Sequence, residues 1–273
     1  MYTPLYLSQM ANYVHGFDSV EQLRLKEQAE FLAPMVYKDV NFKECKQLLE
    51  VGSGVGAQTR ILLEKFPNLQ ITCVDSSVVQ LAQARINLAS FGDRVRFVEQ
   101  DACALQLEER FDAAFVCWTL EHVSSPIQLL KRLRAHLRPG AQIYVTEVFN
   151  SSLYTAPGFA HLRHYVEVMS AFQRKIGGNP DIGIELGNLL IEAGFSTCTT
   201  RFDGFYLDAR SGEKRKQVAE YWKELLKSAA PALLAEGVCT PNAVENMVGD
   251  LEKLGNDENA IFFYQFVQAK VTL

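Results

Sequence analysis

Three glycines spaced two residues apart mark the part of this chain where ligand chemistry is expected. Gly52, Gly54 and Gly56 lie within Leu48–Thr59, between an apolar stretch that predicts a buried strand and a segment that predicts a helix from about Ala57. Glycine permits positive φ angles and lets a ligand lie directly against the main chain. The first turn of a helix adds unpaired N–H groups and a partial positive charge. The pattern therefore predicts a cradle for a polar small molecule at the carboxyl end of a parallel strand.

The glycine spacing alone leaves two kinds of ligand open. Gly52-x-Gly54-x-x-Ala57 fits the dinucleotide-binding pattern, in which alanine can replace the third glycine. Asp75 ends the next predicted strand about 20 residues later, where that pattern requires an acidic residue for the ribose hydroxyls. A nicotinamide cofactor and S-adenosylmethionine both carry a ribose, so both remain candidates at this point.

Two further acidic residues favour S-adenosylmethionine. Glu50 stands two residues before the first glycine, where its carboxylate would repel a pyrophosphate but attract the ammonium group of an amino acid. Asp101, within Gln100-Asp101-Ala102, closes a third predicted strand, and an acid there can accept a hydrogen bond from an adenine amino group. A nicotinamide-dependent oxidoreductase gives no reason for either residue, and it needs a proton relay that the sequence does not display.

Five segments in this order and spacing make the region Leu48–Val148 resemble the class I S-adenosylmethionine-dependent methyltransferases. The similarity is greatest to the small-molecule type grouped with the ubiquinone and menaquinone biosynthesis enzymes. The segments are Glu50–Gly56, Val74–Ser76, Gln100–Ala102, Cys117–Val123 and Leu137–Gly140. The resemblance implies the Rossmann-like methyltransferase fold: an α/β, doubly wound, mostly parallel seven-stranded sheet with an antiparallel edge strand, N-terminal helices and a helical lid inserted near the C-terminus.

The resemblance also implies a set of cofactor-binding residues. Asp75 would take the two ribose hydroxyls, Asp101 and Ala102 would adjoin the adenine, and S-adenosylhomocysteine would be the product. The full expected set comprises Tyr13, Arg24, Glu50, Gly52, Ser53, Gly54, Gly56, Gln58, Asp75, Ser76, Asp101, Ala102, Cys117 and Trp118.

The N-terminal segment is expected to cover the cofactor. Ser19-x-x-Gln22 has the form of a capping box, so a helix should begin there and run to about Leu32, before Pro34. Arg24 would pair with the methionine carboxylate, because its guanidinium is a forked and permanently charged donor, and Tyr13 would close above it. The alternative for Arg24 is a place on a solvated helix face.

Methyl transfer from a sulfonium needs an aligned acceptor and needs a general base only if a proton must leave early. His122 follows the fourth strand and is the first candidate for such a base. Glu121, His161 and His164 are further candidates. An imidazole at that place can instead bond a backbone carbonyl and hold its loop. His161 and His164 could share a helix face, but no third metal ligand accompanies them, so no metal site is expected.

Four aromatic side chains could stack on a planar substrate or belong to the core: Trp118, Tyr154, Tyr221 and Trp222.

Apolar runs and turn residues predict the remaining elements. Strands are expected at 47–51, 69–75, 95–100, 112–117, 141–148, 196–207 and 260–271, the last two pairing antiparallel. Helices are expected at 57–66, 78–90, 125–137, 183–193, 213–229 and 240–254. Val78, Ala82, Ile86 and Ala89 recur at helical spacing and are expected to form the buried face of the second of these helices. The helices at 213–254 interrupt the terminal hairpin.

These elements suggest three parts. Residues 1–40 would form a helical cap over the cofactor, 41–212 with 257–273 the methyltransferase core, and 213–256 a helical lid over a substrate pocket. The lid favours a small-molecule acceptor over an extended peptide.

The 273 residues are 48% hydrophobic and 22% charged with a net charge of −5, as in soluble globular proteins. Without a basic block, a nucleic-acid partner is not expected. No membrane association is expected either, because no apolar run is long enough to span a bilayer. The six cysteines lack metal-knuckle or redox spacing and are expected to be reduced in a cytoplasmic protein. A monomer or homodimer is expected.

The leading expectation is transfer of a methyl group to a small-molecule acceptor. The alternatives are a nicotinamide-dependent oxidoreductase and a non-catalytic protein that binds S-adenosylmethionine but has lost its acceptor site.

Overall fold

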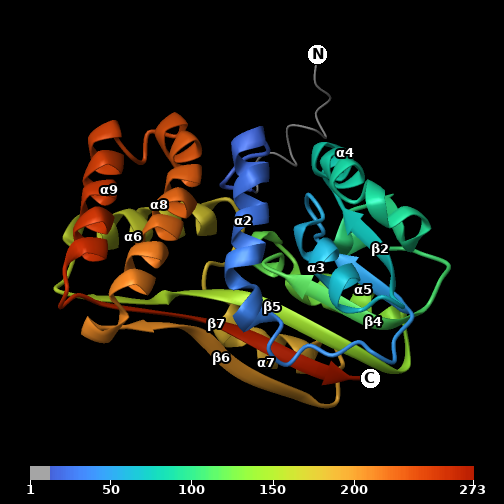
Figure 1. The fold of residues 1–273 in the computed structure, drawn as a ribbon. Helices are drawn as coiled ribbons and strands as arrows, with labels where there is room; N and C mark the ends of the chain where they lie inside the picture. The colour runs from blue at the N-terminus through green and yellow to red at the C-terminus, as the bar shows by residue number, and fades with distance from the viewer. Residues whose placement is uncertain (1–12) are drawn as a thin grey trace.

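The computed structural model describes residues 13–273, which fold around one seven-stranded sheet (Figure 1). The strand order is β3-β2-β1-β4-β5-β7-β6. Only β7 runs antiparallel to its neighbours, β5 and β6. The strands are β1 Gln47–Val51, β2 Gln70–Asp75, β3 Val95–Glu99, β4 Phe111–Cys117, β5 Leu137–Ala156, β6 Cys198–Leu207 and β7 Ile261–Thr272. The expected doubly wound, mostly parallel sheet is confirmed, with the reversed strand one position in from the edge.

Eight α-helices and four short 3-10 turns accompany the sheet within residues 13–273. The helices are α2 Ser19–Val36, α3 Ala57–Lys65, α4 Val78–Asn87, α5 Pro126–Ala135, α6 Ala160–Lys175, α7 Ile182–Glu192, α8 Gly212–Ala235 and α9 Pro241–Asn256. The turns are η1 Ala89–Arg94, η2 Ala102–Ala104, η3 Leu120–His122 and η4 Ala209–Ser211. No helix among these is both long and apolar enough to cross a bilayer.

Alternate residues of the central strands face two separate cores. Leu48 of β1 and Phe115 of β4 pack with α2, α3 and the C-terminal helices, whereas Leu49 and Val116 pack with α5 and α7. Successive side chains on a strand point to opposite faces, so a strand buried on both faces must be apolar throughout. The central strands therefore lie between two helical layers.

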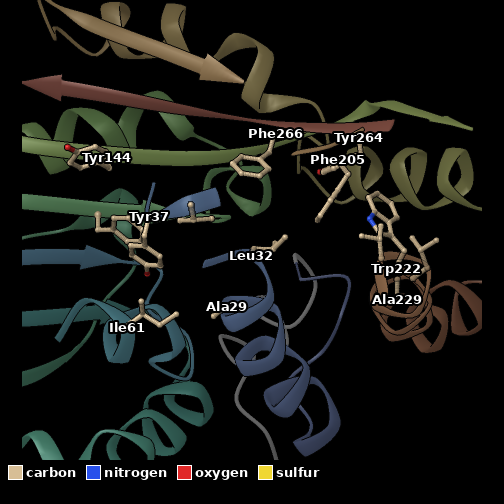
Figure 2. Close-up of a cluster of buried hydrophobic side chains, with 14 of the residues drawn as sticks. Ala29, Leu32, Tyr37, Ile61, Tyr144, Phe205, Trp222, Ala229, Tyr264 and Phe266 are labelled. Atoms are coloured by element: carbon tan, nitrogen blue, oxygen red, sulfur yellow. The ribbon is translucent and has the colours of Figure 1, made fainter. Parts of the chain in front are cut away.

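Helix α2 lies in the middle of the larger core (Figure 2). Its Ala29 and Leu32 are placed between Ile61 of α3 on one side and Trp222 of α8 on the other. This helix therefore contacts both the glycine-loop half of the molecule and the C-terminal helices.

Two sequence expectations about helix ends and faces are wrong. Helix α2 begins after Asp18, whose side chain accepts hydrogen bonds from two backbone N–H groups, and it continues through Pro34 to Val36. Val36 is buried, and this packing outweighs the local cost of the proline. In α4, the expected buried residues Val78 and Ile86 are exposed.

The face of α4 that packs against the protein is offset from the expected one. It carries Gln80, Leu81 and Ala84, and Leu88 follows directly after the helix. Both faces contain apolar side chains at helical spacing, and only the position of the helix on the sheet selects one of them.

The terminal hairpin is interrupted by two helices, as expected, but the structure beside it is larger than the sequence suggested. Strand β5 extends to Ala156, past the expected end at Val148, and its last residues pair with the first part of β7 after an irregularity at 149–154. Helix α6 occupies the stretch that follows and packs on α9 and α8 (Figure 1).

The first turn of α6 is capped from another helix. The residue before it, Phe159, has no side chain able to cap, and the carboxylate of Asp250 on α9 accepts from the backbone N–H groups of His161 and Leu162 at 2.9 and 3.2 Å. Asp250 is buried, so the bond joins α6 and α9 at one defined register.

Candidate active site

A cavity of about 240 Å³ lies at the carboxyl ends of β1, β2, β3 and β4. Its walls come from four loops that follow these strands and from α2. The predicted residues that line it are Tyr13, Gly52, Ser53, Gly54, Gln58, Asp75, Ser76, Asp101, Ala102, Cys117 and Trp118. The structure thus brings together most of the set expected from the sequence; Arg24, Glu50 and Gly56 lie outside the lining.

The three glycines differ in how much space a side chain would find at each position. All have positive φ, at 72° for Gly52, 52° for Gly54 and 76° for Gly56. A Cβ on Gly54 would meet no atom within 4 Å, so this position leaves the floor of the cavity open. A Cβ on Gly52 would overlap Thr119, and one on Gly56 would overlap Leu88. Gly56 therefore serves packing against α4, behind the cavity.

Asp75 braces the glycine loop from the end of β2. Its carboxylate accepts from the backbone N–H groups of Gly54 and Ser77, both at 2.8 Å. Burial raises the pKa of this carboxyl above its usual value, although these N–H groups oppose the shift. The side chain of Ser77 caps α4, so Asp75 is not needed as the cap and remains on the cavity wall.

Glu50 lies beneath the loop, 2% exposed. Its carboxylate accepts from the Thr59 hydroxyl at 2.6 Å, and burial raises its pKa to about 8. Contact between this carboxylate and a ligand ammonium stays a prediction.

The adenine end of the predicted site is polar and open. Asp101 caps the short η2 turn by accepting from the Cys103 N–H at 2.8 Å, and its side chain is exposed. Across the cavity, the Ser53 hydroxyl is buried without a hydrogen-bond partner among the described residues. A buried hydroxyl of this kind is costly unless a ligand or water completes it.

A second cavity, about 90 Å³, adjoins the first. Tyr13, Leu25, Gln28, Trp118 and His122 line both, so these five side chains form the boundary between the two spaces. The rest of its lining combines polar side chains with aromatic ones. The polar ones are His15, Arg24, Glu121, Asn150 and Gln173, and the aromatic ones include Phe205, Tyr221, Trp222, Tyr264 and Phe266.

Arg24 faces the second cavity rather than the first. Its guanidinium donates to both carboxylate oxygens of Glu21 at 2.6 Å and to Gln28 at 2.5 Å. Tyr13 donates to the same Glu21 carboxylate at 2.7 Å. Glu21 thus compensates the charge of Arg24 in this structure. The expected pairing of Arg24 with a methionine carboxylate stays a prediction.

The loop after β4 is held by a buried carboxylate. Glu147 of β5 accepts from the backbone N–H groups of Thr119 and Leu120 at 3.0 and 2.8 Å, and from Glu121 at 3.4 Å. Burial and the neighbouring Glu121 raise the pKa of Glu147 to about 8. The loop also places Trp118 in a left-handed conformation, with φ of 52°. No local pattern singles out Glu147, since it lies in the middle of a largely apolar strand.

His122 stands at the boundary of the two cavities. Its Nε2 is 3.7 Å from a Glu121 carboxylate oxygen, and its Nδ1 is buried without a partner among the described residues. Glu121 in turn accepts from Gln173 at 2.9 Å. An unpartnered imidazole nitrogen at this boundary keeps His122 the first candidate for a general base.

The other sequence candidates lie elsewhere. His161 and His164 border a separate hollow between α6 and α9, and Tyr154 is exposed on the extension of β5. Within residues 13–273 no three His, Cys, Asp or Glu side chains are placed to hold a metal ion. Tyr221 and Trp222 do line the second cavity. Tyr264 and Phe266, which join them there, were expected only as part of a long aromatic strand.

Comparison with known proteins shows what part of this chain is similar to. Residues 49–143 match the family model described as "Methyltransferase domain". Residues 49–143 therefore resemble a methyltransferase domain. The matched segment includes the glycine loop, Asp75, Asp101 and the loop after β4.

Curated methyltransferases are similar to part of this chain. A trans-aconitate 2-methyltransferase from Enterobacter is 32% identical over 115 residues, which are 42% of this chain and 42% of that protein. A demethylmenaquinone methyltransferase from Thermus thermophilus is 28% identical over 138 residues, 50% of this chain and 62% of that protein. The chain thus matches about half of these relatives' length.

The fold extends further than the sequence similarity. The structure of phosphoethanolamine N-methyltransferase 2 from Haemonchus contortus in complex with S-adenosyl-L-methionine superposes with a TM-score of 0.54 at 20% identity. The superposition covers 90% of this chain and 52% of that one. This likeness extends the methyltransferase fold to almost the whole chain.

Proposed function

We propose that this protein transfers a methyl group from S-adenosylmethionine to a small-molecule acceptor. The observation that carries the proposal is the pair of adjoining cavities: one built on the glycine loop and Asp75, the other enclosed by aromatic side chains. Tyr13, Trp118 and His122 line both. A donor in the first cavity and an acceptor in the second would meet at that boundary, which is the arrangement that in-line displacement requires.

The first cavity fits the proposed cofactor. Gly54 leaves space directly over the main chain, and the unpartnered Ser53 hydroxyl offers a hydrogen bond. Asp75 would bind the ribose hydroxyls, with Ser76 beside it, and Asp101 and Ala102 would adjoin the adenine. Gln58, Cys117, Trp118 and Tyr13 complete the proposed contacts. When bound, the cofactor supplies an activated methyl group on a sulfonium.

The chain's own residues would orient the acceptor and exclude water. The second cavity is walled by buried aromatic side chains, which favour a desolvated acceptor. If the acceptor carries a proton that must leave early, His122, beside Glu121, would be the base that takes it. Residues 1–40 would act as a cap over the cofactor and residues 213–256 as a lid over the acceptor, with 41–212 and 257–273 as the core.

Calorimetry on the ligand-free protein tests the cofactor assignment. S-adenosylhomocysteine is expected to bind saturably, whereas a nicotinamide coenzyme is expected to give no saturable heat. The reverse result would replace the proposal with an oxidoreductase. If S-adenosylhomocysteine binds but labelled S-adenosylmethionine transfers no methyl group to any component of a cell extract, the protein is a binding module rather than an enzyme.

The proposal also includes the location, the partners and the oligomeric state of the protein. We propose a cytoplasmic location, a compartment in which the six free cysteines would stay reduced. Small molecules, rather than nucleic acids, are the proposed partners, because the net charge is −5. A monomer or homodimer is the proposed state.

A further inference from the structure

Several polar groups around the second cavity are already paired with neighbouring residues, whereas the His122 Nδ1 has no partner among the described residues. Arg24 is bound by Glu21, Gln173 donates to Glu121, Tyr264 donates to Asn150 at 3.1 Å, and His15 bonds Ser228 at 2.6 Å. These pairs use up donors and acceptors that a ligand would otherwise contact. The groups that remain therefore indicate what the cavity can recognise.

Trp222 of α8 carries one of the remaining groups. The side chain is 3% exposed, and its indole Nε1–H is buried with no acceptor among the described residues. The ring is fixed by edge-to-face contacts with Tyr264 at 4.7 Å and Phe262 at 5.4 Å between centroids. Figure 2 shows Trp222 beside Tyr264 and Phe205. Indole N–H is a donor only, so its partner must be an acceptor atom.

Charge in the cavity excludes an anionic ligand. Arg24 is the one Lys or Arg among the described lining residues, and the two charge-assisted bonds from Glu21 compensate it. Burial lowers the pKa of His15 well below its usual value, so this imidazole is neutral near pH 7. Glu121 adds a carboxylate to the wall. An anion would meet this carboxylate without gaining a free cation.

From these observations we infer that the second cavity takes an uncharged acceptor carrying an oxygen that accepts a hydrogen bond from the Trp222 indole N–H. This inference rests on the proposed function. Trp222 is then a specificity-determining residue, and the Glu21–Arg24 pair selects against carboxylates and phosphates. An anionic acceptor would be buried without a positively charged partner. A neutral acceptor of the same shape would instead accept the hydrogen bond that the Trp222 N–H otherwise lacks.

Three isosteric probes test the inference on the whole protein saturated with S-adenosylhomocysteine. Acetophenone is uncharged and has a carbonyl oxygen, benzoate is the anionic isostere, and ethylbenzene lacks the oxygen. Acetophenone is expected to bind at least tenfold more tightly than benzoate at pH 7.5. Because the chain has two tryptophans, the indole N–H resonances of ¹⁵N-labelled protein separate Trp222 from Trp118. The Trp222 resonance should shift with acetophenone and stay in place with ethylbenzene.

Two substitutions supply matched controls. Trp222→Phe keeps an aromatic ring but removes the N–H, so it should weaken acetophenone binding by about fivefold or more and change ethylbenzene binding by less than twofold. Glu21→Gln removes the carboxylate that compensates the charge of Arg24, so it should strengthen benzoate binding at least fivefold. If Glu21→Gln does not fold, the wild-type and Trp222→Phe measurements decide alone.

The inference is overturned if benzoate binds the wild type as tightly as acetophenone, if Trp222→Phe weakens both neutral probes equally, or if none of the probes binds. Each of these results leaves the proposed function standing as long as S-adenosylhomocysteine binds. Failure of S-adenosylhomocysteine to bind, in contrast, removes the proposed function itself.

Discussion

At the scale of single residues, Asp75 both holds the glycine loop in place and lies where the ligand is proposed to bind. Its carboxylate accepts from Gly54 and Ser77 and also lines the first cavity. Asp75→Ala removes the brace of the glycine loop and the proposed ribose contact together. We expect S-adenosylhomocysteine to bind at least tenfold more weakly, about 1.4 kcal/mol, by isothermal titration calorimetry.

Asp112 provides a matched control for Asp75. It also accepts from backbone N–H groups, those of Lys46 and Gln47, but it does so at the opposite end of β4 from the cavity. Asp112→Ala should lower stability and leave the affinity for S-adenosylhomocysteine unchanged. Equal losses of affinity in both variants would show that general destabilisation, rather than the site, is responsible.

The residues that the sequence identified are those whose role is local. Gly54, Asp75 and Asp101 each act at the end of a strand, where neighbours along the chain reveal the position. Trp222 and Tyr264 meet only because β7 returns beside β5, and Glu147 of β5 holds the loop that follows the neighbouring strand β4. Such partners are set by the sheet register, which no short stretch of sequence records.

At the scale of elements, the loop 118–122 depends on one carboxylate. Glu147→Gln keeps an acceptor oxygen for Thr119 and Leu120, and we expect it to cost about 1 kcal/mol of unfolding free energy. Glu147→Leu leaves buried N–H groups unpaired and should cost about 3 kcal/mol. Urea unfolding measures both. A leucine variant as stable as the glutamine variant would contradict this account of the loop.

Helix α6 depends on a cap from α9. Asp250→Ala leaves two N–H groups at the start of α6 without an acceptor and should destabilise the protein by about 1–2 kcal/mol. Glu252→Ala on the exposed side of the same helix is the control, expected to change stability by less than about 0.5 kcal/mol. Thermal unfolding of the two variants compares them, and equal melting temperatures would refute the capping role.

The element boundaries show where local patterns mislead. Pro34 suggested the end of a helix, yet the buried contacts of Val36 extend α2 past it. Val78 and Ile86 suggested a buried face, yet α4 turns the neighbouring apolar face inward. In both cases the local signal was present, and packing between distant segments decided the outcome.

At the scale of the whole molecule, two buried carboxyls make stability depend on pH. The folded pKa values of Glu50 and Glu147, about 8, lie above the usual 4.5. Their contribution is complete below pH 4.5 and is lost as pH rises through 8, because unfolding releases their protons. His15 has the opposite effect: its lowered pKa makes stability fall as pH drops below about 6.5.

Between pH 6.5 and 8, the pH dependence of stability from Glu50 and Glu147 is separated from that of His15. Ligand-free protein should lose up to about 1.4 kcal/mol of unfolding free energy per pH unit for each of them. Chemical denaturation at several pH values measures the slope. Glu50→Gln combined with Glu147→Gln should flatten it, and an equally steep slope in that double variant would refute the assignment.

The position of β7 has a consequence for biosynthesis. This strand, Ile261–Thr272, is translated after every other element of the sheet, yet it lies between β5 and β6 and carries Tyr264 and Phe266. On the ribosome, the glycine-loop half can assemble while β6 still lacks its neighbour. The second cavity is completed only when β7 has left the exit tunnel, so a nascent chain can acquire its donor-binding half before its acceptor-binding half.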